Sequence, residues 1–250
     1  MGLFSGLKKS FAESQLLETV DEKQIRSLLE KGVDPNCQDK KGWTPLLKKL
    51  NVNPLSKPKV EPSGLARLLI DGGADIYHEN GEHICAFVVT AFRDEPKTMK
   101  VLLEGPADTP KKANHRAAAL SLASGMSHLE IVNLLLEAGT PANQNDGQTE
   151  IMELLLHGIP AELVTSLVEG TRFMEKTKDG RSLINMCRWQ WPPLHRAVFA
   201  GHAETVKALL DAGANPNFVA SDGKTPMGVL TEYTPDEAVR ELLTAAGATD

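Results

Sequence analysis

The residues best suited to chemistry stand together in the segment PPLHRAVFAGHAE, residues 192–204, which contains His195, His202 and Glu204. Imidazole and carboxylate groups could bind zinc, or one histidine could act as a general base. A zinc site needs a third and usually a fourth ligand, and none stands at helical or loop spacing nearby. The His-x-Glu of HAE resembles part of a zinc-deaminase signature, but no PCxxC follows it. We therefore expect two structural histidines and no metal site.

Other catalytic motifs are missing from the sequence. It contains no GxSxG, HExxH, GxxxxGK[ST] or GxGxxG. Acidic pairs such as Asp21-Glu22 and Asp94-Glu95 fall in polar turns, where solvated carboxylates are more common than catalytic ones. The chain is predicted not to be an enzyme and to need no cofactor.

The overall charge narrows the choice of partner. The formal net charge is −6 at pH 7, so the chain does not attract phosphate backbones, and nucleic acid is not an expected partner. A basic protein would be steered towards it favourably. The three cysteines, Cys37, Cys85 and Cys187, are far apart and form no CxxC pair, so we interpret them as buried, reduced thiols.

The N-terminal residues MGLFSGLKKS do not resemble a targeting segment. Lys8 and Lys9 fall where a signal peptide needs its apolar core, and no apolar run approaches the length of a membrane-spanning helix. The myristoylation motif needs Ser or Thr where this chain has Gly6. These features predict a cytoplasmic protein that does not associate with membranes.

The elements that position these residues follow an internal repeat. A leucine-rich segment ending in glycine recurs about seven times, at intervals of about 33 residues or about 33 plus an insertion. Its apolar pairs, such as Leu135-Leu136 and Leu209-Leu210, mark one buried helix face. A glycine just past that face supplies a left-handed helix end. These glycines are Gly32, Gly73, Gly105, Gly139, Gly170, Gly213 and Gly247.

A second signature precedes another helix in several repeats. It is clearest in GWTPLL at 42–47 and DGKTPMGVL at 222–230, where a threonine able to cap a helix precedes a proline suited to its first turn. Each unit is therefore predicted to contain a short helix, a turn, a longer helix and a projecting loop.

This pattern resembles the ankyrin repeat, and PPLHRAVFAGHAETVKALLDAGANPN at 192–217 matches it almost position for position. The resemblance covers essentially the whole chain and is weakest at 81–124. It implies an all-α solenoid of stacked helix-turn-helix units with projecting β-hairpin-like loops, in which His195 bonds to backbone and neighbouring-repeat groups. We expect one domain over 1–250, with a capping unit at about 3–38, repeats at about 39–221 and a capping repeat at about 222–250.

Two insertions interrupt the period, near 51–63 and 172–190. Pro54, Pro58 and Pro62 in the first exclude a continuous helix and indicate an exposed loop between the two helices of one unit. The second is interpreted either as an extended finger loop or as a false-start helix, and it adds aromatic residues to a chain that is poor in them.

In ankyrin proteins, the residue after the loop glycine and the residues ending the first helix face the concave, partner-binding surface. The resemblance carries these roles to Trp43, Glu82, Gln148, Trp191 and Lys224, and to Thr90, Leu156, His157, Phe199 and Tyr233; Tyr77, Phe173 and Trp189 complete the candidate set. Large aromatic side chains in such positions suit an interaction hot spot. Replacing Trp191 by Ala is then expected to leave stability nearly unchanged. The alternative is that Trp43 or Trp191 packs on its own finger loop.

The favoured function is therefore a monomeric protein-binding module that acts as an adaptor or an inhibitor. One alternative is a bacterial immunity-type inhibitor that neutralises a toxin or lytic enzyme. Another is small-ligand or RNA binding in the groove beside the finger loops, for which only Lys176, Lys178, Arg181 and Arg188 supply basic residues near aromatic ones.

Overall fold

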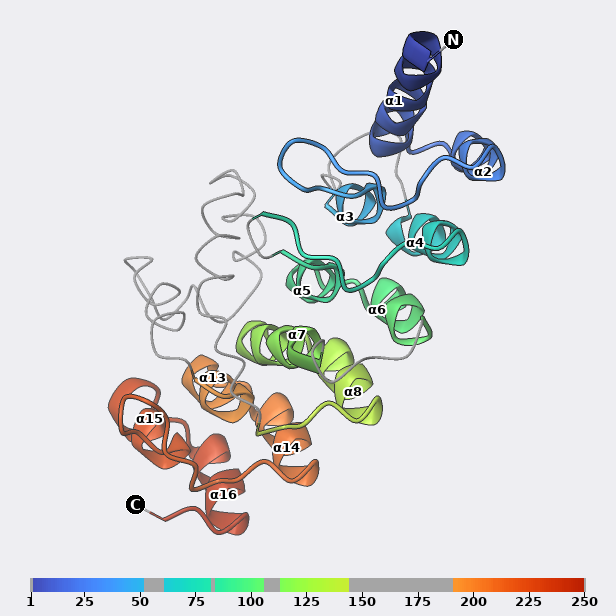
Figure 1. The fold of residues 1–250 in the computed structure, drawn as a ribbon. Coiled ribbons are helices and arrows are strands. Elements are labelled where there is room, and N and C mark those ends of the chain that lie inside the picture. Colours follow the sequence, from blue (N-terminus) through green and yellow to red (C-terminus); the bar gives the residue numbers. More distant parts are fainter. Residues whose placement is uncertain (1, 52–60, 82–83, 106–112, 144–190, 250) are drawn as a thin grey trace. The chain divides into compact units, whose positions relative to one another are not determined.

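The computed structural model describes residues 2–51, 61–81, 84–105, 113–143 and 191–249 (Figure 1). Within these ranges all regular elements are helices and no strand occurs, so the predicted all-α class is confirmed. Backbone contacts divide the chain into two compact units, one of residues 1–90 with 97–107 and the other of residues 91–96 with 108–250. That the whole chain forms a single domain with two capping units stays a prediction.

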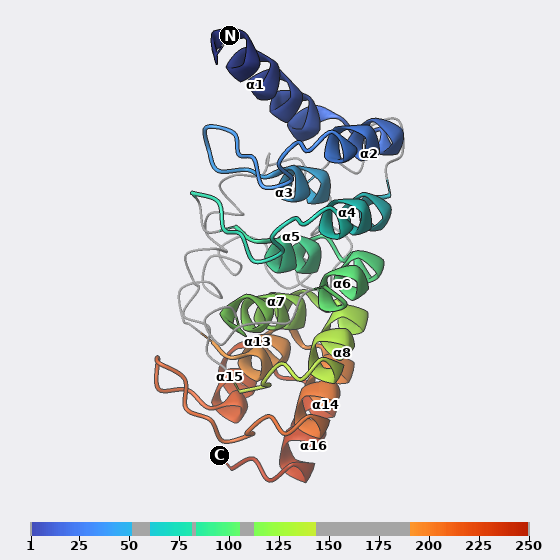
Figure 2. The same cartoon turned by 45° about the vertical axis from the view of Figure 1, so that its right-hand side comes forward.

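The first unit is built from pairs of helices. Its elements are α1 (Gly2–Glu18), α2 (Glu22–Glu30), α3 (Pro45–Leu50), α4 (Pro62–Asp71), most of α5 (Ala86–Phe92) and most of α6 (Pro96–Leu103). Helix α3 packs on α4 within its pair, while α1 packs on α3 and α2 on α4 between neighbouring pairs. The helices therefore stand in two rows, which Figure 2 shows.

The second unit repeats this arrangement. Its helices are α7 (Ala113–Met126), α8 (Leu129–Glu137), α13 (Pro193–Ala200), α14 (Ala203–Asp211), α15 (Pro226–Tyr233) and α16 (Glu237–Ala245). One row runs from α7 through α13 to α15, and the other from α8 through α14 to α16. Leu135 and Leu209, which the repeat pattern assigned to the buried face, are fully buried.

The predicted helix starts are confirmed. The Thr44 hydroxyl accepts the Leu47 N–H at 3.3 Å, and the Thr225 hydroxyl accepts the Gly228 N–H at 3.1 Å. A proline follows each threonine at the first helical position, where its missing N–H costs no hydrogen bond. Pro62 likewise stands at the first helical position of α4. Pro54 and Pro58 lie outside the described residues.

The predicted left-handed glycines are confirmed at five helix ends and wrong at one. Positive φ angles of 77° to 93° occur at Gly32, Gly73, Gly139, Gly213 and Gly247. Gly105 does not adopt such an angle; there a Cβ would lie 3.0 Å from the Ile76 Cδ1 atom, so close packing favours glycine instead. Gly170 lies outside the described residues.

Two projecting loops are fully described, one in each compact unit, and both are short hairpins, as expected. In the first unit the Asp39 N–H donates to the Trp43 carbonyl at 3.1 Å and the Gly42 N–H to the Asp39 carbonyl at 3.0 Å. In the second, the Ala220 N–H donates to the Lys224 carbonyl at 2.9 Å, with Gly223 at the turn. We call residues 39–43 and 220–224 the first and last fingers.

Neighbouring repeats are also joined by asparagine side chains. Asn36 donates its amide to the Gly73 carbonyl at 3.0 Å and accepts the Asp75 N–H at 2.7 Å. Asn143 forms the same pair of bonds with Gly213 and Asn215, and Asn217 forms it with Gly247 and Thr249. Each asparagine therefore satisfies a carbonyl at the end of the neighbouring helix and an N–H of the loop beyond it.

Replacing Asn36 by Ala is expected to lower the free energy of unfolding by about 1 to 3 kcal/mol, because two hydrogen bonds between repeats are lost. The measurement is urea denaturation followed by circular dichroism. The matched control is Asn133→Ala on the exposed side of α8, which should not destabilise the chain because Ala favours helix. Equal stability of the two variants would contradict the bridging role.

Candidate functional site

His195 has a structural role. Its side chain is fully buried, and its Nε2 atom lies 3.0 Å from the Lys224 carbonyl of the next finger, so Nε2 carries the proton that is donated. Burial lowers the pKa of the imidazole and favours its neutral form. The expected backbone bond to a neighbouring repeat is confirmed. Among the described residues, no three His, Cys, Asp or Glu side chains gather as a metal site would require.

Trp191 is a core residue, which corrects its prediction as a surface anchor. The side chain is fully buried, and the indole N–H donates to Asp222 Oδ2 at 3.0 Å. Its ring meets the ring of Phe199 edge-on at a centroid distance of 5.3 Å and that of Tyr233 at 6.1 Å. The ring packs on α13 and α15 and its N–H bonds to the last finger, which belongs to the next repeat; the loop before Trp191, on which the alternative placed the ring, lies outside the described residues.

Three further candidates also lie in the interior. Phe199 is 8% exposed, Tyr77 is 7% exposed and Thr90 is 1% exposed. The ring of Tyr77 stacks on that of Phe87 at 5.7 Å, at the position where other repeats carry the bridging asparagine. Their prediction as contact residues is therefore corrected, because buried side chains contribute packing rather than surface.

Three predicted residues remain at the surface: Trp43, Lys224 and Tyr233 are each partly exposed. The Lys224 ammonium pairs with Glu232 and lies 5.3 Å from the centre of the Tyr233 ring. The hydrogen bond that Lys224 donates to Glu232 raises the pKa of Lys224. The other candidates, Glu82, Gln148, Leu156, His157, Phe173 and Trp189, lie outside the described residues.

The cysteines that the structure describes are free thiols, as expected. Burial raises the pKa of Cys37 to about 11 and that of Cys85 to about 12. Both thiols stay protonated at neutral pH and are therefore poor nucleophiles. Cys187 lies outside the described residues.

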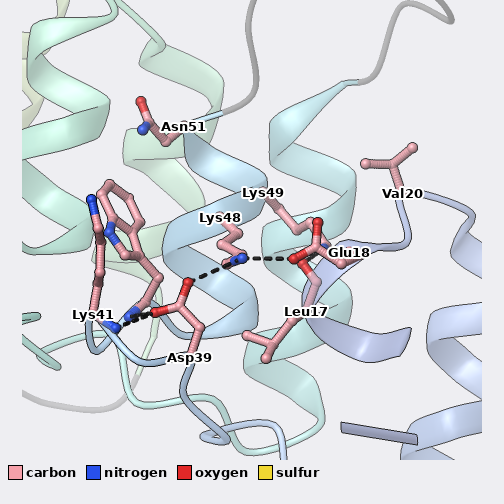
Figure 3. A pocket seen from close by; sticks show the side chains of 9 residues that line it. Leu17, Glu18, Val20, Asp39, Lys41, Lys48, Lys49 and Asn51 are labelled. Atoms are coloured by element: carbon pink, nitrogen blue, oxygen red, sulfur yellow. Dashed lines mark hydrogen bonds and ion pairs between the residues drawn. The ribbon is translucent and has the colours of Figure 1, made fainter. Parts of the chain in front are cut away.

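Trp43 lines a pocket in the first unit (Figure 3). The pocket has a volume of about 340 Å³ and lies between the end of α1, the first finger and α3. Its walls are Leu17, Glu18, Val20, Asp39, Lys41, Trp43, Lys48, Lys49 and Asn51. We call it the Trp43 pocket.

Lys48 joins two carboxylates at this pocket. Its Nζ atom lies 2.7 Å from Glu18 Oε1 and 3.1 Å from Asp39 Oδ2 (Figure 3). Burial acts to lower the pKa of Lys48, but the hydrogen bonds to both carboxylates hold it above its ordinary value. Asp39 also accepts the N–H groups of Lys41 and Trp43, so one carboxylate shapes the finger and positions the lysine.

Lys49 is a buried cation that the sequence analysis missed. It is 1% exposed, and its Nζ atom donates to the Leu17 carbonyl at 2.6 Å. Burial lowers its pKa to about 8. A signal was present in the sequence, because Lys49 falls on the same helix face as Leu46 and Leu50.

Family comparisons agree with this architecture. The profile described as "Ankyrin repeats (3 copies)" matches residues 142–249, and the profile described as "Ankyrin repeats (many copies)" matches residues 20–48. The chain belongs to the ankyrin-repeat family. Ankyrin repeats are generally protein–protein interaction modules, and the fold is typically non-enzymatic.

The individual relatives are distant. The chain is 25% identical over 230 residues to YahD of Escherichia coli (strain K12), a protein named for its ankyrin repeats, and the match covers 90% of each chain. It is 26% identical over 211 residues to "Ankyrin repeat and SOCS box protein 3" of Bos taurus, covering 84% of this chain and 32% of that protein. The chain thus spans about a third of the latter relative's length.

A solved structure shares the fold. An ankyrin repeat domain from Acinetobacter baumannii AYE superposes with a TM-score of 0.66 at 21% identity, covering 95% of this chain and 98% of that one. In the part of the chain that the structure describes, no helix has the length and apolar character needed to cross a membrane.

Replacing Trp191 by Ala is expected to lower the free energy of unfolding by about 3 to 5 kcal/mol, because a fully buried indole leaves a cavity. Urea denaturation measures the loss. Trp43→Ala is the matched control and should cost less than half as much, because its indole is already partly in solvent. If the Trp191 variant were as stable as the Trp43 variant, the assignment of Trp191 to the core would be wrong.

The lowered pKa of Lys49 in the folded chain is expected to affect how the free energy of unfolding depends on pH. Its pKa rises from about 8 in the folded chain to about 10.5 on unfolding, so the unfolded chain binds more protons between these values. The free energy of unfolding should therefore gain a contribution as pH rises from 8 to 10.5. Lys49→Met should lack that contribution in urea titrations, whereas Lys207→Met at an exposed site should keep it. Identical pH profiles for wild type and Lys49→Met would contradict the assignment.

Proposed function

We propose that this protein binds a partner protein through its fingers and the surface beside them, with Trp43 as the main aromatic contact. The observation that carries the proposal is the half-buried indole on the wall of the Trp43 pocket. A partner side chain entering this pocket would bury the rest of the indole at little cost in side-chain entropy, since the indole is already partly buried. Lys224 and Tyr233 offer a polar and aromatic contact at the last finger.

The protein acts in this proposal as a monomeric, cytoplasmic adaptor or inhibitor. The net charge of −6 favours a basic partner, which long-range attraction would steer to the surface. A bacterial immunity-type inhibitor that blocks a toxin or lytic enzyme would suit this charge, and the likeness to bacterial ankyrin proteins is compatible with it. RNA or small-ligand binding is the second candidate, and it rests on Lys176, Lys178, Arg181 and Arg188, which stand near Phe173 and Trp189 in the sequence.

The test is affinity capture from a lysate of the source cells, with the wild type compared with a Trp43→Ala, Lys224→Ala double variant. Both positions are partly exposed, so the variant should stay folded, which circular dichroism checks. The control is Lys207→Ala on α14, in the other helix row. A protein retained by the wild type and the control but lost by the double variant is the expected result. A partner retained equally by all three would place the binding surface elsewhere.

A further inference from the structure

The Trp43 pocket carries an excess of positive charge. Three lysines, Lys41, Lys48 and Lys49, line it, whereas Glu18 and Asp39 are its only acidic residues. Both carboxylates are bonded to the same ammonium group, that of Lys48. The charges of Lys41 and Lys49 therefore have no carboxylate bonded to them among the described residues.

Lys49 is the least compensated of the three. An ammonium group has three hydrogen-bond donors, and a buried one is costly unless it is paired. Among the described residues, the Leu17 carbonyl is the single acceptor bonded to Lys49 Nζ. Glu18 acts on this ammonium through its field, without a direct bond. The chain thus keeps a costly positive charge beneath the pocket without its own counter-ion.

The carboxylate of Glu18 indicates the kind of group that suits the pocket. Its carboxylate already occupies one side of the Lys48 ammonium at 2.7 Å. Yet the side chain is 71% exposed, and Glu18 is the last residue of α1, where the helix dipole disfavours a negative charge. An incoming carboxylate can therefore displace Glu18 at low cost and take its place on Lys48.

The remaining walls suit the body of such a group. The indole of Trp43 and the apolar side chains of Leu17 and Val20 also line the pocket. A volume of about 340 Å³ lies at the lower end of the range for ligand pockets and accommodates one side chain or a small acid. The pocket combines an apolar wall with an ammonium group, which matches a short aliphatic chain that ends in a carboxylate.

We propose that the Trp43 pocket binds the carboxylate of an acidic side chain of the partner protein. The carboxylate bonds to Lys48 in place of Glu18, the buried charge of Lys49 attracts it from below, and Trp43 covers its methylene groups. This inference rests on the proposed function only for the source of the carboxylate. A partner that is basic overall would present one acidic residue at this point and basic residues around it.

The test uses the whole chain and defined probes. Two blocked tetrapeptides that differ only in Glu or Gln, and sodium acetate as a free acid, are titrated at constant ionic strength set with sodium chloride. The readout is the indole N–H signal of Trp43 in a ¹H–¹⁵N spectrum, assigned with Trp43→Phe. The Glu peptide should shift this signal saturably, and the Gln peptide should not.

Charge variants then assign the contacts. Lys48→Met should weaken binding of the Glu peptide by roughly tenfold or more, because a charge-assisted hydrogen bond is lost, and Lys49→Met should weaken it to a smaller extent. Glu18→Gln should tighten binding, because the competing carboxylate is gone. Lys207→Met at an exposed, remote site is the matched control and should bind as the wild type does.

Each other outcome contradicts the proposal. Equal binding of the Glu and Gln peptides would show that the pocket does not select a carboxylate. Acetate binding as tightly as the Glu peptide would assign the pocket to a free small acid and overturn the protein side chain as its source. Since these titrations need no captured protein, their failure is distinct from failure of the proposed protein-binding function.

Discussion

The mutual burial of leucines between adjacent helix pairs is the constraint on which the rest of the structure depends. A helix of eight or nine residues, such as α13 or α14, cannot bury an apolar face or remain helical by itself. Leu69 in the first unit and Leu209 in the second are fully buried only because a neighbouring pair covers them. Each buried leucine contributes about 1.5 to 3 kcal/mol relative to an exposed one, so the stack supplies what the single repeats lack.

Stacking does not provide hydrogen-bond partners for the backbone groups at the helix ends. Local caps and asparagine side chains supply them. Threonine hydroxyls cap the first turns, left-handed glycines close the last ones, and Asn36, Asn143 and Asn217 bond to a neighbouring repeat. Tyr77 occupies the equivalent position after Gly73 and stacks on Phe87. At that position aromatic packing within the first unit replaces the polar bridge. The asparagine bridge that is missing at Tyr77 is thus replaced by stacking of two aromatic rings.

The same rigid frame allows a group that is unfavourable for stability to persist. Burial lowers the pKa of Lys49 to about 8, which means that folding acts against its charge. Such a group survives when the surrounding core is stable enough to hold it, and charged groups kept at a cost are common at binding sites. Asp39 illustrates the coupling between fold and site, since its carboxylate both closes the finger turn and holds Lys48 at the pocket.

The sequence by itself determined the repeat, most of the described helix starts and ends, the hairpin loops and the structural role of His195, because these follow from local spacing and backbone chemistry that recur in most repeats. Only the tertiary structure decided which aromatic and charged side chains are buried and which are exposed. Trp191 and Phe199 lie in the interior because residues distant in sequence, such as Tyr233 and Asp222, enclose the indole or bond to it. Lys49 lies beneath a pocket because α1 ends directly beside it. Exposure is a property of neighbours brought together by stacking, and repeat spacing does not carry that information.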